Sequence, residues 1–358
     1  MFLNLSDIVI KSSFGSYQVK FGSIEGTNFK NSFFLIDQNL KTEFELATEQ
    51  AIYLLAKEAD KTLSVVEEVM IELSSQGMTK NHELVVIGGG FLQDIGTIVA
   101  SLYMRGIDWT YVPTTLAAMG DSCIGGKSSI NAGNTKNLVG NYYPPREVFI
   151  DSVFVTTLPE REIVAGISEM MKICYAKSFE TFTECTELLN RWQLDGSQSA
   201  ITQAIQISLV SKQFFVEEDE FDLGVRKLLN FGHSFGHALE SASGYKIPHG
   251  VAVLLGMIAA SQHPLSETSE ETASLVSSII HYCKMVREEI INEIVDIDFL
   301  RFSQSLAKDK KNSASNLVLI LPHAGGLRIV EHPFSQNSLQ IATDAMKSSL
   351  ELVLNEIR

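Results

Sequence analysis

The sequence predicts an α/β plus all-α protein, in which a domain built on a mostly parallel sheet precedes a mainly helical domain. In the first 155 residues, short β-rich runs alternate with helical patterns, as is typical of βαβ units. After about Thr156, long amphipathic stretches dominate the chain. We therefore expect a first domain at residues 1–155 and a second at residues 156–358, with a site in the cleft between them.

The individual elements can be placed in order along the chain. Runs of apolar and β-branched residues predict strands at Ser32–Asp37, Glu83–Ile87 and Asp108–Pro113, and apolar periodicity predicts helices at Glu45–Ala59 and Thr62–Gln76. In the second half, the same periodicity predicts helices at Pro159–Lys177, Ser199–Val216, Gly224–Ser243, Gly250–Gln262 and Ser269–Val286. A β-rich run at Leu317–Pro322 and a closing helix from Asn337 to about Ile357 follow.

Composition excludes several classes of protein. The chain has 358 residues, of which 45% are hydrophobic and 20% charged, as in an ordinary globular protein. No apolar run reaches the roughly 18 residues of a membrane span. The N-terminus lacks the pattern of a signal peptide, so we expect a cytoplasmic protein. The net charge of −15 repels nucleic acid and anionic membranes. An anionic ligand must therefore be captured by a local basic pocket.

Four cysteines lie far apart and form no CxxC pair, which argues against a disulfide framework and against a thiolate zinc site. They are Cys123, Cys174, Cys185 and Cys283.

A glycine-rich loop joins a predicted strand to a predicted helix in the segment VVIGGGFLQDIG. Backbone without Cβ atoms at a helix N-terminus can approach a phosphate, and the helix dipole favours its negative charge. The fingerprint GxGxxG is incomplete, because Gln93 stands where the third glycine belongs. Both a nucleotide site and a simple tight turn are compatible with Gly88, Gly89 and Gly90.

A second polar segment, DSCIGGKSSINAGNTKN, holds Asp121, Lys127, Lys136 and Asn137. Glycine-flanked lysines beside small polar residues favour an anion cradle, since ammonium groups can converge on phosphate oxygens. The alternative is a solvated polar loop.

Histidines carry the strongest signal. His233 and His237 are four residues apart on a predicted helix, so their rings share one face, and His249 follows after a short loop. Imidazoles at this spacing are a common metal-binding arrangement when a carboxylate joins them. Spacing alone favours His233 and His237 as ligands, with Glu240 or the remote Glu169 completing the site. Lys172 lies one turn beyond Glu169 on the same predicted helical face.

Together these motifs resemble those of 3-dehydroquinate synthase and of the wider sugar-phosphate cyclases. The resemblance runs from about Ser32 to Gly325 and includes GGGFLQD, PTT, DSCIGGK, TLPERE, NFGHSFGH and DKK. It implies a Rossmann-like NAD-binding domain, a helical metal- and substrate-binding domain, and a homodimer. The implied reaction converts 3-deoxy-D-arabino-heptulosonate 7-phosphate to 3-dehydroquinate plus phosphate in the shikimate pathway. NAD+ is used transiently, together with a divalent metal, zinc or cobalt.

The resemblance also assigns roles to individual residues. For NAD it implies Asp37, Glu58, Lys61, Gly89, Gly90, Asp94, Thr114, Thr115, Asp121, Lys127, Lys136, Phe154 and Thr157. For the metal it implies Glu169, His233 and His249, with His237 as a hydrogen-bonding or proton-shuttling neighbour. For the substrate it implies Asp121, Lys127, Asn137, Lys172, Lys212, Arg226, Asn230 and Lys311, with Arg105 reaching a phosphate across the dimer.

Several positions depart from the family pattern. Val251 replaces the glutamate of the usual HGE, Thr135 replaces a glycine, and GNYYPP resembles cyclases that act on neutral sugar phosphates. Arg226 with Lys212 favours instead a substrate that carries both carboxylate and phosphate. The alternatives are a secondary-pathway cyclase acting on another heptulose phosphate, a metal-dependent alcohol dehydrogenase and a non-catalytic homologue.

Overall fold

The computed structural model describes residues 6–25, 27, 29–40, 50–133, 135–294, 296–309, 312–313 and 315–357. It divides into two compact units: unit 1 is Met1–Leu158 with Gly196–Glu220, and unit 2 is Pro159–Asp195 with Phe221–Arg358. Helix α6 (Gln198–Glu218) therefore groups with the N-terminal part of the chain, although the sequence assigned it to the second domain.

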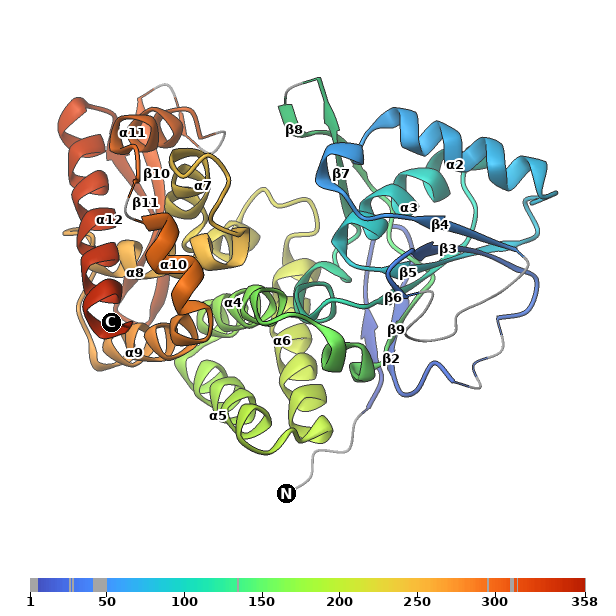
Figure 1. Ribbon diagram of the computed structural model, residues 1–358, viewed down its shortest axis with the longest axis horizontal. Coiled ribbons are helices and arrows are strands. Elements are labelled where there is room, and N and C mark those ends of the chain that lie inside the picture. Colours follow the sequence, from blue (N-terminus) through green and yellow to red (C-terminus); the bar gives the residue numbers. More distant parts are fainter. Residues whose placement is uncertain are drawn as a thin grey trace. The chain divides into compact units, whose positions relative to one another are not determined.

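Unit 1 is built on a sheet whose strands follow the order β1-β2-β9-β6-β5-β3-β4 (Figure 1). The strands are β1 (Ile8–Ile10), β2 (Tyr17–Phe21), β9 (Glu147–Ile150), β6 (Trp109–Pro113), β5 (Glu83–Gly88), β3 (Ser32–Asp37) and β4 (Ala51–Leu54). All neighbouring pairs are parallel except β1 with β2. The three strands predicted in this half are confirmed, as is the mostly parallel sheet.

Helices and a hairpin complete unit 1. They are η1 (Glu58–Asp60), α2 (Leu63–Ser75), α3 (Gly90–Leu102), η2 (Tyr103–Arg105), η3 (Ala118–Ser122), the antiparallel hairpin β7 (Lys127–Ala132) with β8 (Thr135–Tyr142), and η4 (Ser152–Thr157). Helix α3 packs against β5 and β7, so the glycine loop at its start is held between the sheet and the hairpin.

The helix predicted at Glu45–Ala59 is wrong where the structure describes it. Residues 41–49 lie outside the described part of the chain, and Ala51–Leu54 is strand β4, paired in parallel with β3. Four consecutive apolar or aromatic residues are compatible with a helix or with a strand. This segment forms a strand because it pairs with the edge of β3.

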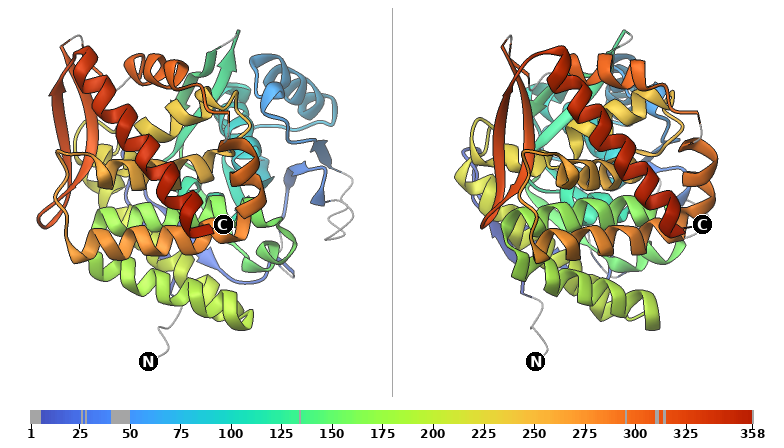
Figure 2. Two further views of the ribbon diagram at one scale, coloured as in Figure 1. Left: turned by 60° about the vertical axis from the view of Figure 1, so that its left-hand side comes forward. Right: turned by 90° about the vertical axis from the view of Figure 1, so that its left-hand side faces the viewer.

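Unit 2 is mainly helical (Figure 2). Its elements are α4 (Glu160–Lys177), α5 (Phe179–Asp195), η5 (Val225–Asn230), α7 (His233–Ala242), α8 (His249–Gln262), α9 (Glu270–Cys283), η6 (Lys284–Val286), α10 (Arg287–Ile294), α11 (Phe299–Ala307), the hairpin β10 (Asn316–His323) with β11 (Gly326–Pro333), and α12 (Gln336–Ile357). The single helix predicted at Gly224–Ser243 is wrong, since Gly232 adopts a φ of 79° and separates η5 from α7. The α/β plus all-α class is confirmed.

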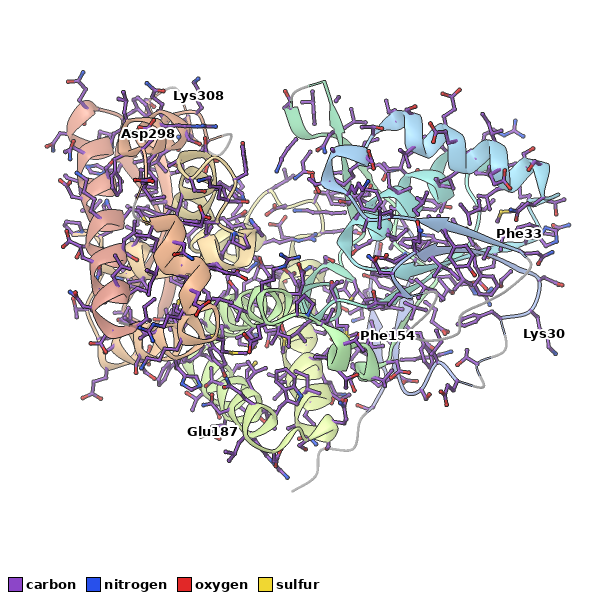
Figure 3. The ribbon with its side chains drawn as sticks, viewed as in Figure 1. Lys30, Phe33, Phe154, Glu187, Asp298 and Lys308 are labelled. Carbon is purple, nitrogen blue, oxygen red and sulfur yellow. The ribbon has the colours of Figure 1, made fainter. Side chains whose placement is uncertain are left out.

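Apolar side chains fill the interior of each unit. Phe33 and Phe154 are each 1% exposed, whereas Lys30, Glu187 and Asp298 lie at the surface (Figure 3). Helix α8 is buried on all sides, and this explains why its sequence is apolar throughout.

Glycines let α8 approach its neighbours closely. A Cβ on Gly256 would lie 2.2 Å from the carbonyl oxygen of Gly232, and one on Gly250 would lie 2.2 Å from Cα of Ala165 on α4. Real Cβ atoms do not come this close to backbone, so neither position has room for a side chain. Because α4, α7 and α8 carry Glu169, His233 and His249, this packing sets the distances between those side chains.

The glycine contact gives a first prediction. We expect Gly256→Ala to lower the free energy of unfolding by about 1–3 kcal/mol, because the new methyl group must push α7 away from α8. Chemical denaturation measures this, with Gly22→Ala as control, since its Cβ would lie 3.6 Å from the Phe149 ring and meet ordinary contact. Equal stability of Gly256→Ala and the parent chain would contradict the proposed role of the glycine.

Candidate functional site

Three histidines of unit 2 converge. One ring nitrogen each of His233, His237 and His249 lies within 4.8 Å of the other two. The ring centroids of His233 and His237 are 5.3 Å apart, which confirms that they share one face of α7, and the ring of His249 lies 5.4 Å from that of His233. Pro248 precedes His249, which opens α8, so the ring projects from the first turn of that helix.

A buried carboxylate and ammonium group adjoin the histidines. Oε1 of Glu169 lies 3.9 Å from Nε2 of His233 and 3.5 Å from Nε2 of His249. Its other oxygen, Oε2, pairs with Nζ of Lys172, and both residues are buried. Glu169 and Lys172 therefore lie on one face of α4, as their spacing predicts, and they also form an ion pair.

Electrostatics keeps this carboxylate ionised. Burial acts to raise the pKa of Glu169, but the charge of Lys172 and the hydrogen bond and charge of His249 outweigh it, so the pKa falls below its usual range. Burial acts to lower the pKa of His249, but hydrogen bonds to Glu169 and Glu240 raise it to about 10. The cluster thus presents an anionic oxygen next to imidazole nitrogens.

This donor set fits a divalent metal ion. Imidazole nitrogens and a carboxylate oxygen are ligands that zinc and related cations prefer, and three such ligands leave positions open for substrate oxygens. The geometry gathers all three imidazoles, so both the set Glu169, His233 and His249 and a set that includes His237 are compatible with it. The ligand set stays a prediction.

In unit 1, several of the candidate cofactor residues lie at the carboxyl edge of the parallel sheet. The chain moves outward from β3 to β4 and then returns to β5 on the other side of β3, which makes a topological switch point between β3 and β5. Ligands of such sheets bind outside the carboxyl ends of strands at that point. Asp37 ends β3, and Gly89 and Gly90 follow β5 at the start of α3.

The local geometry of this loop suits an approaching phosphate. A Cβ on Gly90 would meet nothing within 4 Å, so its backbone faces open space, whereas a Cβ on Gly89 would lie 2.8 Å from Thr115. Thr114 donates its backbone N–H to Gly88, which keeps the β6 end beside the loop. Burial raises the pKa of Asp37, partly opposed by a hydrogen bond from the backbone of Asn39.

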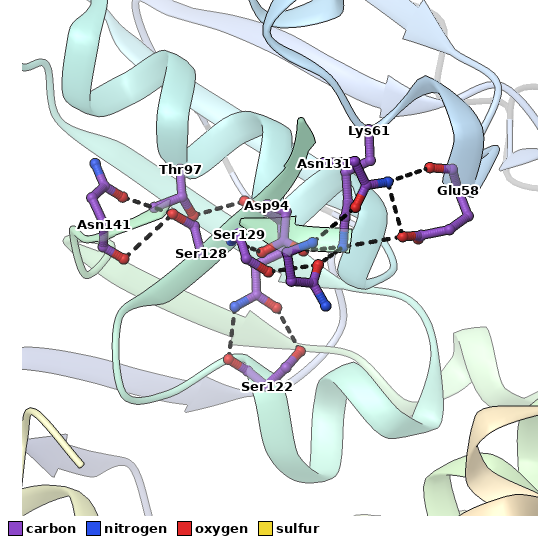
Figure 4. A network of polar contacts seen from close by, with 11 residues as sticks. Glu58, Lys61, Asp94, Thr97, Ser122, Ser128, Ser129, Asn131 and Asn141 are labelled. Atoms are coloured by element: carbon purple, nitrogen blue, oxygen red, sulfur yellow. Dashed lines mark hydrogen bonds and ion pairs between the residues drawn. The ribbon is translucent and has the colours of Figure 1, made fainter. Parts of the chain in front are cut away.

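A polar network surrounds Lys61 (Figure 4). Its Nζ donates to Oδ2 of Asp94 at 3.1 Å and to Oδ1 of Asn137 at 2.8 Å, and lies 3.5 Å from Oε1 of Glu58. The other oxygen of Asp94 accepts the backbone N–H of Ser129 at 2.8 Å. Burial raises the pKa of Asp94, against the charge of Lys61. The structure thus brings together four of the predicted residues: Glu58 of η1, Lys61 directly after it, Asp94 of α3 and Asn137 of β8.

A pocket of about 410 Å³ opens beside this network. Its lining includes Gly90, Asp94 and Lys127, which were predicted, and Gln93, Ser122, Ser128, Ser129, Gly140, Asn141 and Tyr142, which were not. Gln93 and Ser122 exchange two hydrogen bonds, of 2.7 Å and 2.5 Å, so the residue in place of the third glycine ties η3 to α3. This pocket favours the nucleotide interpretation of the glycine loop over a simple turn.

Asp121, which is half-buried, and Lys212, which is buried, form an ion pair within unit 1. Nζ of Lys212 lies 2.6 Å from Oδ1 of Asp121 and donates to the carbonyl groups of Asp121 and Ile124 at 2.7 and 3.1 Å. Helix α6 therefore delivers this lysine to η3, which explains why α6 groups with unit 1.

The other predicted residues are scattered over both units. In unit 1, Arg105, Lys136 and Thr157 are exposed and Phe154 is buried. In unit 2, Arg226 is 4% exposed on η5, and Asn230 at the end of η5 donates to the carbonyl oxygen of Lys227 at 3.1 Å. Lys311 lies outside the described residues.

No helix in the described part of the chain combines the length and the apolar character that a membrane crossing requires.

Relatives of known structure share the fold. A 2-deoxy-scyllo-inosose synthase complexed with carbaglucose-6-phosphate, NAD+ and Co2+ matches with a TM-score of 0.78 and 22% identity, covering 96% of this chain and 100% of that one. A 2-epi-5-epi-valiolone synthase from Streptomyces hygroscopicus with NAD+ and Zn2+ bound gives 0.75 and 21%, covering 99% of both chains. A glycerol dehydrogenase from Schizosaccharomyces pombe gives 0.62 and 15%, covering 94% and 90%. These likenesses define the fold class.

Sequence relatives define the family. The family described as "3-dehydroquinate synthase N-terminal" matches residues 51–165, and "3-dehydroquinate synthase C-terminal" matches residues 166–312. A 3-dehydroquinate synthase from Streptococcus pneumoniae is 37% identical over 80% of this chain and 79% of its own. One from Alkaliphilus metalliredigens is 34% identical over 77% of both chains. The chain belongs to the 3-dehydroquinate synthase family.

The histidine cluster gives a second prediction. We expect the full chain to bind one divalent ion, and His233→Ala to lose it, because two ligands hold such an ion far more weakly than three. His237→Ala is expected to keep most of the metal. Equilibrium dialysis followed by elemental analysis measures both. Stoichiometric metal in His233→Ala would refute the ligand assignment, and loss of metal in His237→Ala would make His237 a ligand.

Proposed function

We propose that this chain is a 3-dehydroquinate synthase. It would remove phosphate from 3-deoxy-D-arabino-heptulosonate 7-phosphate and close the carbocycle of 3-dehydroquinate, as a carbon-oxygen lyase that uses NAD+ and a divalent metal. The observation that carries the proposal is the contact of Glu169 with Lys172 and with two imidazoles inside unit 2. The homodimer and the cytoplasmic location expected from the sequence stay predictions.

Two groups of residues would hold the cofactors. Glu169, His233 and His249 offer ligands for the metal, and the carboxyl edge of the sheet, with Asp37, Gly89 and Gly90, offers a dinucleotide site. When bound, the metal would polarise a substrate hydroxyl and NAD+ would accept and return a hydride.

The chain's own residues would orient the substrate and move protons. Lys172 is a buried ammonium group held beside an ionised carboxylate, so it can bind a substrate oxygen that carries partial negative charge. His237 is exposed within the histidine cluster, which gives its ring access to the solvent for proton exchange. A chain of net charge −15 needs such local cations to hold an anionic sugar phosphate.

Arg226 supports an acidic substrate. It is 4% exposed, and a planar guanidinium binds a carboxylate through two parallel hydrogen bonds. Asn230, one turn further on η5, carries an amide that can donate to the same substrate.

The proposed function is tested by following phosphate, NADH and product mass together. We expect phosphate release and formation of 3-dehydroquinate with catalytic amounts of NAD+, since hydride is removed and returned on one molecule. Steady accumulation of NADH in step with product would support a dehydrogenase instead. No turnover by folded protein that has bound metal and NAD+ would support a non-catalytic homologue.

Arg226 gives a further prediction. Charge-assisted hydrogen bonds contribute about 1.5–3 kcal/mol each, so Arg226→Ala is expected to lower kcat/KM for the acid by roughly two orders of magnitude or more. Lys212→Ala is expected to lower kcat/KM by a smaller factor, because an ammonium group does not make the two parallel hydrogen bonds of a guanidinium. Steady-state kinetics measures both.

The control substrate for this prediction is a neutral sugar phosphate such as sedoheptulose 7-phosphate. The parent chain should prefer the acid, because the neutral sugar offers Arg226 no carboxylate. Faster turnover of the neutral sugar phosphate, or unchanged turnover of the acid by Arg226→Ala, would replace the proposal with a secondary-pathway cyclase.

A further inference from the structure

The carboxylate of Glu240, on α7, faces the ring of His249, on α8. Its Oε2 lies 3.1 Å from Nδ1 of His249, while Nε2 of the same ring lies 3.5 Å from Oε1 of Glu169. The two nitrogens therefore have different partners. Among the described residues, His249 is the hydrogen-bond and ion-pair partner of the Glu240 carboxylate, and the Glu240 side chain is 15% exposed.

This contact fixes which ring nitrogen of His249 can bind a metal ion. An imidazole that ligates a metal carries one proton, and the carboxylate at Nδ1 accepts the hydrogen bond of that proton, so the lone pair for the metal lies on Nε2. Nε2 is the nitrogen that lies near Glu169. Without an acceptor at Nδ1, the ring can rotate and exchange tautomers, since its exposed side leaves it room to move.

Helix geometry explains why Glu240 reaches this ring. It lies three residues after His237 and seven after His233, so it shares the helix face that carries both imidazoles. Close packing of α7 on α8 through Gly232 and Gly256 then brings that face to His249. On α8 itself, the side chain two positions after His249 is Val251, which is 1% exposed and offers no carboxylate.

We propose that Glu240 is a positioning residue for the metal centre. It holds Nδ1–H of His249 and so aims Nε2 at the cation that Glu169, His233 and His249 would bind. Carboxylates in this relation to a ligand histidine orient the ring and raise its basicity, and removing one weakens metal binding by about 10–100-fold. The inference rests on the proposed metal site and adds a residue that does not itself touch the metal.

The experiment compares Zn2+ affinity of the full chain and its variants, by competition with a chromophoric chelator. Glu240→Ala removes the hydrogen-bond acceptor, and we expect its Zn2+ affinity to be about 10–100-fold weaker than that of the parent chain. Glu240→Gln keeps an acceptor without charge, and we expect its Zn2+ affinity to be about 10-fold weaker. The matched control is Glu267→Gln, which removes the carboxylate of another pair in unit 2, Glu267 Oε1 with His323 Nε2 at 2.8 Å. Its Zn2+ affinity should equal that of the parent chain.

A second readout separates positioning from general stability. Co2+ bound in place of Zn2+ reports ligand geometry in its visible absorption, so Glu240→Gln should shift this spectrum. In the metal-free state, the unfolding midpoint of Glu240→Gln should equal that of the control variant Glu267→Gln. Parent-like affinity and spectrum in Glu240→Gln would overturn the inference and leave the metal site standing. If the parent chain binds neither Zn2+ nor Co2+, the proposed function fails instead. Glu240→Gln decides the outcome if Glu240→Ala does not fold.

Discussion

The close approach of α8 to α4 and α7 is the constraint on which the candidate metal site depends. The candidate ligands Glu169, His233 and His249 are far apart in sequence, and three different helices carry them. At the contacts that set their spacing, Gly250 faces the backbone of Ala165, and Gly256 faces the backbone of Gly232. A side chain at either position would push the helices apart, and a metal–ligand distance tolerates a change of only about 0.2 Å.

Ion pairs of buried lysines provide the second organising feature. Lys61 with Asp94, Lys172 with Glu169, and Lys212 with Asp121 each place an ammonium group against a carboxylate. Their environments differ in effect: burial dominates at Asp94 and raises its pKa, whereas Lys172 and His249 together dominate at Glu169 and lower its pKa. A buried pair contributes little to stability after desolvation, so the repeated use of such pairs is better explained by function.

The sequence predicted the elements whose patterns are local. Strands β3, β5 and β6 are short apolar runs, α4, α6 and α12 have long periodic patterns, and α8 is a long apolar run, so their predicted ranges match the structure closely. Strand β4 could not be predicted, because its identity depends on pairing with β3. The break at Gly232 likewise depends on a positive φ that packing against α8 requires.

In the candidate site, too, local spacing could be predicted from the sequence, whereas contacts between separate elements could not. His233 and His237 on one face followed from helical spacing, but the contact of Lys61 with Asp94, and that of Glu240 with His249, join residues on separate elements. Spacing alone offers Glu240 as a candidate ligand, whereas in the structure its carboxylate lies beside Nδ1 of His249. Val251 shows the consequence: the carboxylate absent from α8 does not leave His249 without one, because α7 supplies it through tertiary packing. A change in one motif residue must therefore be judged by what the neighbouring helix contributes to the same ring.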